Sequence, residues 1–183
     1  QSALDDAQRT SSLKVLFIRK TAISAKESFN DLIERILKSK VAFDVSQNIM
    51  MFQNNSRILL GGFHSEDDID KYVGVEYDEI VVEELNQLTE DKYEKLRGSL
   101  RTSKLNWRPR MYASFNPGGV GHNFVKSRFV LPQRLQAETS TRFIPATFTE
   151  NVYINKEYQD YLLNLTGDLG RAWREGDFDL FAG

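Results

Sequence analysis

Two adjacent carboxylates, Glu83 and Glu84, directly follow the short apolar run at residues 80–82. In sheets that hydrolyse nucleoside triphosphates, one acid at the carboxyl end of a strand holds the metal. The next acid aligns and deprotonates the attacking water. The same pair could also be a solvated strand end or the charged first turn before a helix. The residues alone leave both interpretations open.

A second polar tip follows a later apolar stretch, at residues 114–119 (Ser-Phe-Asn-Pro-Gly-Gly). Pro117 favours an extended approach and ends a strand, and the two glycines after it permit close backbone approach or positive φ. Such a sequence is also ordinary turn chemistry. If its strand neighbours the one that precedes Glu84, Ser114 and Asn116 are suited to sensing a phosphate.

Other candidate residues have structural alternatives that we favour. His122 follows the glycine turn with no second ligand four residues later, which indicates a surface or capping role rather than metal ligation. The two tryptophans, Trp107 and Trp173, are interpreted as packing anchors. Four arginines flank one predicted helix and the strand that follows it. They form either a solvated basic face, which we favour, or contacts to a phosphate backbone or to a neighbouring subunit's nucleotide. These are Arg97, Arg101, Arg108 and Arg110.

The phosphate-binding pattern G-x-x-x-x-G-K-[ST] does not occur in these 183 residues. The glycine pairs at residues 61–62 and 118–119 are not followed by Lys and Ser or Thr. The sequence therefore shows no evident loop to cradle the β- and γ-phosphates of a nucleotide.

Strands and helices are predicted to alternate along the chain, which indicates an α/β fold with a mainly parallel sheet. A hairpin is predicted where two strands flank the Asn-Asn-Ser turn at residues 54–56, and residues 66–71 form an acidic surface stretch. Strands are predicted at residues 14–19, 49–53, 57–60, 80–84, 108–115 and 141–148, and helices at residues 2–10, 25–38, 89–100, 120–130 and 156–174.

Composition is that of a globular chain long enough for one sizeable core. The net charge of −2 gives no overall basic surface for nucleic acid, and the absence of cysteine excludes disulfides and thiolate metal sites. No apolar stretch approaches the ~20 residues that span a bilayer. The first residues lack the features of a signal peptide and resemble the middle of a helix, so we expect a fragment of a longer protein.

Four segments together resemble the ATPase domain of tailed-bacteriophage terminase large subunits, the DNA-packaging motors. They are residues 15–21, 80–89, 110–122 and 171–179. The resemblance implies a RecA-like additional-strand P-loop NTPase core that lacks its first strand and phosphate loop. Residues 1–155 would form the partial core, and residues 156–183 a helical lid and linker toward an absent nuclease domain.

The resemblance also implies roles for individual residues. Glu83 would occupy the Walker B position that binds the metal, and Glu84 would be the catalytic carboxylate. Ser114 and Asn116 would form the coupling motif that reports loss of the γ-phosphate. The family often has a basic residue near the place held here by Val73, where Lys71 is only nearby, so Lys71, Arg97 and Arg101 are candidates for contact with nucleic acid or with a neighbouring subunit.

The function implied is hydrolysis of ATP with Mg²⁺ to package double-stranded DNA into a procapsid. Expected partners are the portal, the small terminase subunit and further copies of the protein in a ring, with no membrane. Packaging would take place in the host cytoplasm at the portal, and the protein would be absent from the mature virion. Two alternatives remain: another additional-strand NTPase, such as a helicase-like motor, or a non-catalytic assembly module with the same fold.

The strand pattern makes one geometric prediction. The carboxyl ends of residues 14–19, 80–84 and 110–115 should lie along one edge of the sheet, so that the side chains of Glu84 and Asn116 share a cleft there.

Overall fold

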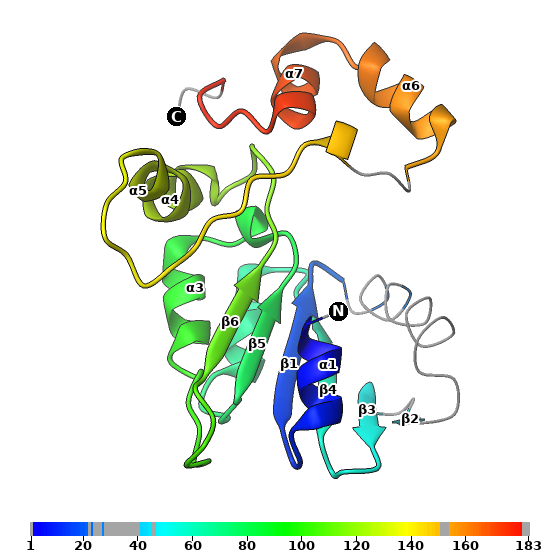
Figure 1. The fold of residues 1–183 in the computed structure, drawn as a ribbon, viewed down its shortest axis with the longest axis vertical. Coiled ribbons are helices and arrows are strands. Elements are labelled where there is room, and N and C mark those ends of the chain that lie inside the picture. Colours follow the sequence, from blue (N-terminus) through cyan, green and yellow to red (C-terminus); the bar gives the residue numbers. More distant parts are fainter. Residues whose placement is uncertain are drawn as a thin grey trace. The chain divides into compact units, whose positions relative to one another are not determined.

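Six strands between residues 14 and 113 form one sheet (Figure 1). The computed structural model describes residues 2–21, 23, 27, 41–44, 47–150 and 154–180. Strands β4, β1, β5 and β6 lie side by side in parallel, and β2 and β3 extend the sheet in antiparallel pairing from β4. The predicted α/β fold is confirmed. The strands are β1 (Lys14–Arg19), β2 (Val41–Asp44), β3 (Ile49–Phe52), β4 (Arg57–Gly62), β5 (Glu79–Val82) and β6 (Arg110–Ala113).

The chain divides into two units that are described separately. The sheet unit contains Gln1–Glu84 and Asp91–Ser114, and the helical unit contains Leu85–Glu90 and Phe115–Gly183. Both polar tips identified in the sequence lie where the chain passes from the sheet unit to the helical unit.

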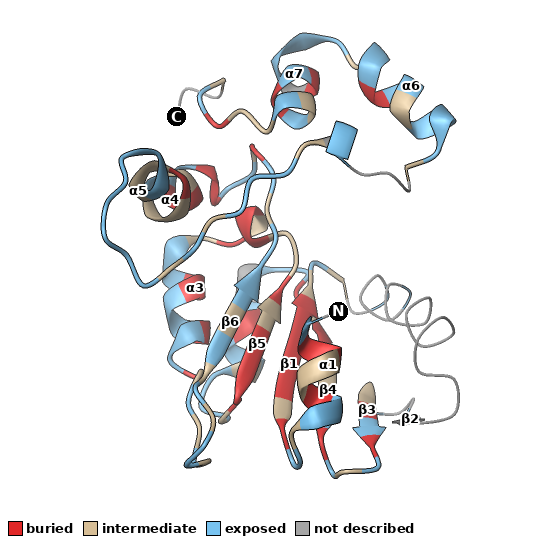
Figure 2. Cartoon of the chain, viewed as in Figure 1, coloured by how far each residue is buried: buried red, intermediate tan, exposed pale blue. Residues whose placement is uncertain are grey.

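Helix α1 (Ser2–Arg9) lies against β1 and covers one face of the sheet (Figure 1). Its buried residues pack with strand residues that recur at every second position, as expected of side chains sharing one face. Burial is concentrated on β1, β4 and β5, whereas β6 is exposed (Figure 2). The cluster under α1 comprises Ala3, Leu4, Ala7, Leu13, Val15, Phe17, Met50, Phe52, Ile58 and Leu60.

The opposite face carries the intervening strand residues. Leu16, Ile18, Ile80 and Val82 are fully buried, which explains why β1 and β5 read as continuous apolar runs in the sequence. Helix α3 (Glu90–Arg97) contributes its own buried residues to the sheet unit, including Leu96.

The predicted hairpin is confirmed, because β3 pairs with β4 across the Asn-Asn-Ser turn. Asn55 adopts a φ of 64°, a left-handed conformation that asparagine tolerates better than most residues. The side chain of Asn54 donates to the carbonyl oxygens of Ala7 and Thr10, so it also satisfies the carboxyl end of α1.

The helical unit begins with the short η3 (Leu85–Gln87) and continues after residue 115. Helix α4 (His122–Val125), a π-helical turn η4 (Lys126–Val130) and α5 (Leu131–Arg134) follow one another directly, so the helix predicted at residues 120–130 extends further. The remaining helices are η5 (Phe148–Glu150), α6 (Lys156–Asn164) and α7 (Gly167–Glu175).

The prediction of a strand at residues 141–148 is wrong. The segment pairs with no strand among the described residues, and several of its backbone N–H groups donate to side chains instead. The N–H of Thr141 donates to Thr139 Oγ1 at 3.1 Å, and that of Phe143 donates to Gln133 Oε1 at 2.9 Å. Pro145 has no N–H to offer a neighbouring strand.

The prediction of one helix over residues 156–174 is also wrong, because two helices occupy this segment. Leu165 leaves the helical conformation with φ −60° and ψ 120°, and Gly167 has a φ of 76°. Of the predicted apolar stripe, Leu162 is buried, whereas Tyr158 and Tyr161 are exposed. The helix predicted at residues 25–38 lies outside the described residues.

None of the helices described is long and apolar enough to cross a bilayer.

Candidate functional site

Strands β1, β5 and β6 end at the same edge of the sheet. Ile18 is in register with Val82, and Val82 with Ala113. Backbone hydrogen bonds continue one step further, from Glu83 N–H to the oxygen of Ile18 (2.9 Å) and from Ser114 N–H to the oxygen of Val82 (3.0 Å). The prediction that these carboxyl ends share one edge is confirmed.

The two acids lie just beyond β5 rather than within it. Strand β5 ends at Val82, and Glu83 and Glu84 form a turn. Glu84 has a φ of 60°. A residue with a Cβ in this left-handed region costs on the order of 1–3 kcal/mol, and such strain is common at functional sites. The turn therefore holds Glu84 in a conformation that the free chain would avoid.

Arg19, at the end of β1, contacts both acids. Its Nε lies 3.5 Å from Glu83 Oε2, and its Nη2 lies 3.6 Å from Glu84 Oε1. All three side chains are partly exposed. The guanidinium offsets the mutual repulsion of the two carboxylates. Our reading of the sequence missed Arg19, although a basic residue ending a strand parallel to β5 could have indicated it.

Burial raises the pKa of Glu83, and the Glu84 carboxylate raises it further, while Arg19 opposes the shift. A carboxylate in this environment gains from any additional cation. The pair thus offers carboxylate oxygens of the kind that divalent cations prefer as ligands.

Ser114 is exposed at the same edge of the sheet, in the sheet unit. Asn116 is exposed in the helical unit, on a loop that ends at α4. That the side chains of Glu84 and Asn116 share a cleft stays a prediction.

The loop after Asn116 depends on its glycines. Gly118 and Gly119 have φ values of 95° and 86°. A Cβ on Gly119 would lie 2.4 Å from the backbone oxygen of Asn86, which no structure tolerates without displacement. Gly119 is therefore required both for its φ and for its close approach to Asn86.

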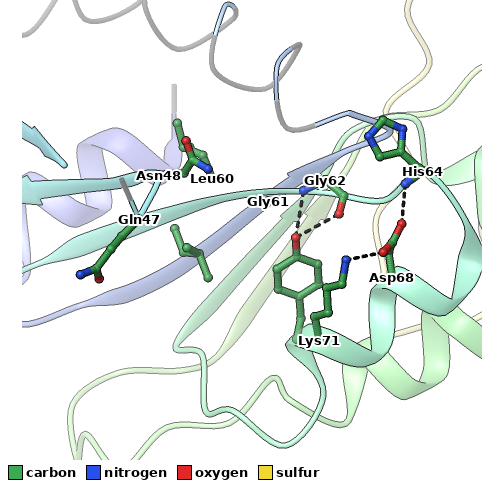
Figure 3. A pocket seen from close by; sticks show the side chains of 10 residues that line it. Gln47, Asn48, Leu60, Gly61, Gly62, His64, Asp68 and Lys71 are labelled. Atoms are coloured by element: carbon green, nitrogen blue, oxygen red, sulfur yellow. Dashed lines mark hydrogen bonds and ion pairs between the residues drawn. The ribbon is translucent and has the colours of Figure 1, made fainter. Parts of the chain in front are cut away.

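The basic candidates are exposed and each has a partner in the sheet unit. Lys71, in η2 (Glu66–Tyr72), pairs with Asp68 and lines a pocket of about 310 Å³ at the end of β4 (Figure 3). Arg97 Nη1 lies 3.4 Å from Glu94 Oε2. Arg101 Nη2 donates to the oxygen of Gly74 at 3.0 Å. These ion pairs and hydrogen bonds do not bring the three cations together.

The wall of this pocket is held by Tyr72. Its hydroxyl accepts from Gly62 N–H at 2.9 Å and donates to the oxygen of Gly62 at 3.0 Å (Figure 3). A Cβ on Gly61 would lie 2.4 Å from that hydroxyl oxygen. The predicted acidic stretch at residues 66–71 is therefore a helix with a packing role, and its Ile69 is fully buried.

His122 is buried rather than at the surface. Its Nδ1 accepts a hydrogen bond from Gly118 N–H at 3.0 Å, and its ring stacks on Phe178 at 5.6 Å. Burial lowers the pKa of His122. Among the described residues, no group of three or more His, Cys, Asp or Glu side chains could hold a metal. A structural role is therefore favoured for this histidine.

The tryptophans both use their indole N–H groups. Trp107 packs against the cluster under α1 and donates to the oxygen of Asp78 at 3.1 Å. Trp173 is exposed and donates to the oxygen of Pro117 at 3.3 Å. The interpretation as a packing anchor agrees with the contacts of Trp107, whereas Trp173 is exposed and contributes a hydrogen bond.

Glu79 is a second residue that sequence reasoning missed. It begins β5, is fully buried, and neither carboxyl oxygen has a hydrogen-bond partner among the described residues. Burial raises its pKa to about 8, and the nearby Asp6 adds to the shift while Arg110 opposes it. Asp6 in turn pairs with Arg110 at 2.9 Å. Glu79 is thus a buried acid at the start of β5, whose other end leads to Glu83.

The family model of the phage terminase large subunit matches residues 7–174. This chain belongs to that family. Sequences of curated proteins give no match to it. The family match agrees with the resemblance carried by the acid pair and by the Ser114–Gly119 tip.

Solved terminase structures share the fold of this family member. The large terminase of the thermophilic bacteriophage D6E matches with a TM-score of 0.72 and 16% identity over 97% of this chain and 44% of its own. The same terminase in complex with ATP-γ-S matches with a TM-score of 0.67 and 16% identity over 97% of this chain and 43% of its own. The ATPase domain of the Thermus phage P74-26 large terminase matches with a TM-score of 0.59 and 14% identity over 96% of this chain and 80% of its own.

These identities support the fold alone, which is the RecA-like α/β fold of terminase ATPase domains. The chain spans less than half the length of the D6E terminase.

Proposed function

We propose that this chain is part of the ATPase motor of a phage terminase large subunit, which couples Mg²⁺-dependent ATP hydrolysis to packaging of double-stranded DNA. One observation carries the proposal. Glu83 and Glu84 stand together at the carboxyl edge of parallel strands, within reach of Arg19, in a chain of this family. Open α/β sheets bind their ligands at this edge.

The residues present fit a magnesium ion shared with a nucleotide. Mg²⁺ in such sites takes one or two protein carboxylates and otherwise binds phosphates and water. Glu83 would hold the ion, which when bound neutralises charge on the phosphates. Glu84 would orient the attacking water and accept its proton. Ser114 and Asn116 would report loss of the γ-phosphate.

Nucleotide complexes of a relative support this assignment. The D6E terminase has been solved with ADP and with ATP-γ-S, and both structures share this fold. We propose the same class of ligand here. In the parent protein, residues 1–155 would belong to the ATPase core and residues 156–183 to a lid and linker.

The proposed partners follow from the same assignment. Double-stranded DNA, the portal, the small terminase subunit and further copies in a ring would meet the motor inside the host cell. Lys71, Arg97 and Arg101 remain candidates for contact with DNA or with a neighbouring subunit's nucleotide, because all three are exposed. Their present partners are exposed ion pairs or a single hydrogen bond, which cost little to break.

The decisive experiment is Glu84→Gln in the full-length parent protein. The amide is nearly isosteric but cannot accept the proton of water, so we expect hydrolysis to fall by roughly 10²–10⁴-fold. Nucleotide affinity should stay close to that of the wild type. Steady-state turnover and equilibrium titration with ATP measure the two quantities.

Glu138→Gln is the matched control, because Glu138 is exposed in the helical unit and has no role in the proposed site. It should hydrolyse ATP like the wild type. Normal turnover of Glu84→Gln would reject Glu84 as the catalytic residue. Absence of turnover in the wild type, with DNA and partners supplied, would favour a non-catalytic assembly module.

A further inference from the structure

Asn86 binds the loop that carries Asn116 at three points. Its Oδ1 accepts from Asn116 N–H at 3.3 Å, and its Nδ2 donates to the oxygen of Gly118 at 2.9 Å. Its backbone oxygen accepts from Gly121 N–H at 2.9 Å. All of these residues lie in the helical unit. One residue therefore fixes the beginning, middle and end of the loop.

The amide of Asn86 matches this arrangement chemically. A backbone N–H requires an acceptor and a backbone oxygen requires a donor, and asparagine offers one of each on a short side chain. Asn86 is only 5% exposed. A buried amide that loses its partners is destabilising, so the position of Asn86 favours the conformation of the loop in which these hydrogen bonds are made.

Two further contacts hold the same loop. His122 Nδ1 accepts from Gly118 N–H, and Trp173 Nε1 donates to the oxygen of Pro117. The side chain of Asn116 makes no hydrogen bond to any described residue and is exposed. The loop backbone is thus fixed while the Asn116 amide stays available for a ligand.

Asn86 also follows Glu84 by two residues in the chain. A displacement of the Glu84 turn would therefore displace Asn86 and, through its hydrogen bonds, the loop that carries Asn116. A displacement of that loop would affect the Glu84 turn in the same way. We propose that Asn86 is a positioning residue that links the catalytic carboxylate segment to the phosphate-sensing loop. This inference rests on the proposed function, since it assigns Asn86 a part in coupling hydrolysis to DNA movement.

The test is a double-mutant cycle of Asn86→Ala and Asn116→Ala in the full-length protein with DNA and its packaging partners. Turnover, ATP affinity and DNA packaged per ATP are measured. Asn86→Ala should lower turnover or packaging per ATP by roughly 10- to 100-fold, as expected for a misplaced sensing group. ATP affinity should change by less than about threefold, which is below 1 kcal/mol.

The cycle separates positioning from general stability. If Asn86 acts through Asn116, adding Asn86→Ala to Asn116→Ala should reduce coupling little further. Asn123→Ala is the matched control, because Asn123 is an exposed asparagine on α4, next to the loop. Additive losses, or a lower melting temperature with normal turnover and coupling, would overturn the proposal.

Asn86→Ser provides a second variant if Asn86→Ala does not fold. Its short, uncharged hydroxyl does not reach both the Asn116 N–H and the Gly118 oxygen, so the same cycle can be measured with it. Glu84→Gln runs in parallel. If Glu84→Gln abolishes turnover while the Asn86 variants couple normally, this inference fails and the proposed function stands. If Glu84→Gln remains active, Glu84 is not the catalytic residue and this inference fails with that assignment. If the wild type does not hydrolyse ATP, the proposed function itself fails.

Discussion

At the scale of single residues, the acid pair and the buried Glu79 show how position along one strand changes a carboxyl group. Glu83 and Glu84 lie beyond the end of β5, partly exposed and beside Arg19. Glu79 lies at its start, fully buried, with Asp6 nearby. The environment of Glu83 and Glu84 favours binding of a cation, whereas the environment of Glu79 favours its protonated, neutral form.

Stability should therefore fall with rising pH because of Glu79. Its pKa rises from 4.5 in the unfolded chain to about 8 in the folded protein. Below about pH 4.5 the carboxyl is protonated in both the folded and the unfolded chain, so it has no effect on stability. Between pH 4.5 and 8 only the unfolded chain releases the proton, so the free energy of unfolding falls until the folded form also ionises near pH 8. Glu79→Gln should remove this dependence and stabilise the protein at pH 9 by up to about 5 kcal/mol, because each unit of pKa difference is worth about 1.4 kcal/mol.

Urea unfolding of wild type and Glu79→Gln at pH 5, 7 and 9 measures the effect, with the exposed Glu138→Gln as control. The difference between Glu79→Gln and wild type should widen with pH. Equal changes of unfolding free energy with pH for all three proteins would show that Glu79 has the same pKa in the folded and unfolded chain.

At the scale of elements, η2 and β4 are held together where Tyr72 crosses Gly61 and Gly62. Gly61→Ala should destabilise the sheet unit by about 1–3 kcal/mol, because its Cβ would meet the Tyr72 ring at 2.4 to 2.8 Å. The displaced ring would also lose its bonds to Gly62.

Thermal or urea unfolding of Gly61→Ala, Tyr72→Ala and the double variant tests this contact. Gly61→Ala should cost much less in the Tyr72→Ala background, because the clash is gone. The same cost in both backgrounds would place the effect in the backbone of β4 rather than at Tyr72.

The strands were easier to predict from sequence than the rest of the fold. Strands β1 and β5 are continuous apolar runs because both of their faces are buried, and the hairpin has a clear Asn-Asn-Ser turn. The segment at residues 141–148 is rich in residues common in strands, yet the N–H groups of Thr141 and Phe143 bond to the side chains of Thr139 and Gln133. Nothing local in the sequence distinguishes those partners from a neighbouring strand.

Part of the candidate site could also be predicted from the sequence, and part could not. Glu83, Glu84 and Ser114 could be placed at one edge because parallel strands end together. Arg19 was missed although it ends a strand parallel to β5. Asn86 could not be assigned, since its role depends on contacts with a loop far away in the sequence. Hydrogen bonds to Gly118 and Asn116 follow from the path of a loop, which residue patterns do not specify.

At the scale of the whole molecule, the 183 residues contain both acids but no G-x-x-x-x-G-K-[ST] loop. Affinity in this nucleotide-binding class depends on the amides and lysine of that loop and on the Ser or Thr that binds magnesium. Residues 1–183 alone should therefore bind ATP with magnesium weakly or not at all.

Titration calorimetry of residues 1–183 with ATP and magnesium measures this, and a large terminase that contains the G-x-x-x-x-G-K-[ST] loop is the control. We expect tight binding only by the control. Micromolar binding by the 183 residues would place the nucleotide site elsewhere in this fold, away from the acid pair.

The left-handed conformation of Glu84 sets stability against activity at one position. Glycine, or to a lesser degree asparagine, adopts a φ near 60° without the penalty that glutamate pays. Directed evolution under heat selection alone should therefore drift toward glycine at this position, gaining about 1 kcal/mol. Each glycine variant selected in this way would lose the proposed base. Selection of this protein for thermostability therefore needs a test of activity in every round.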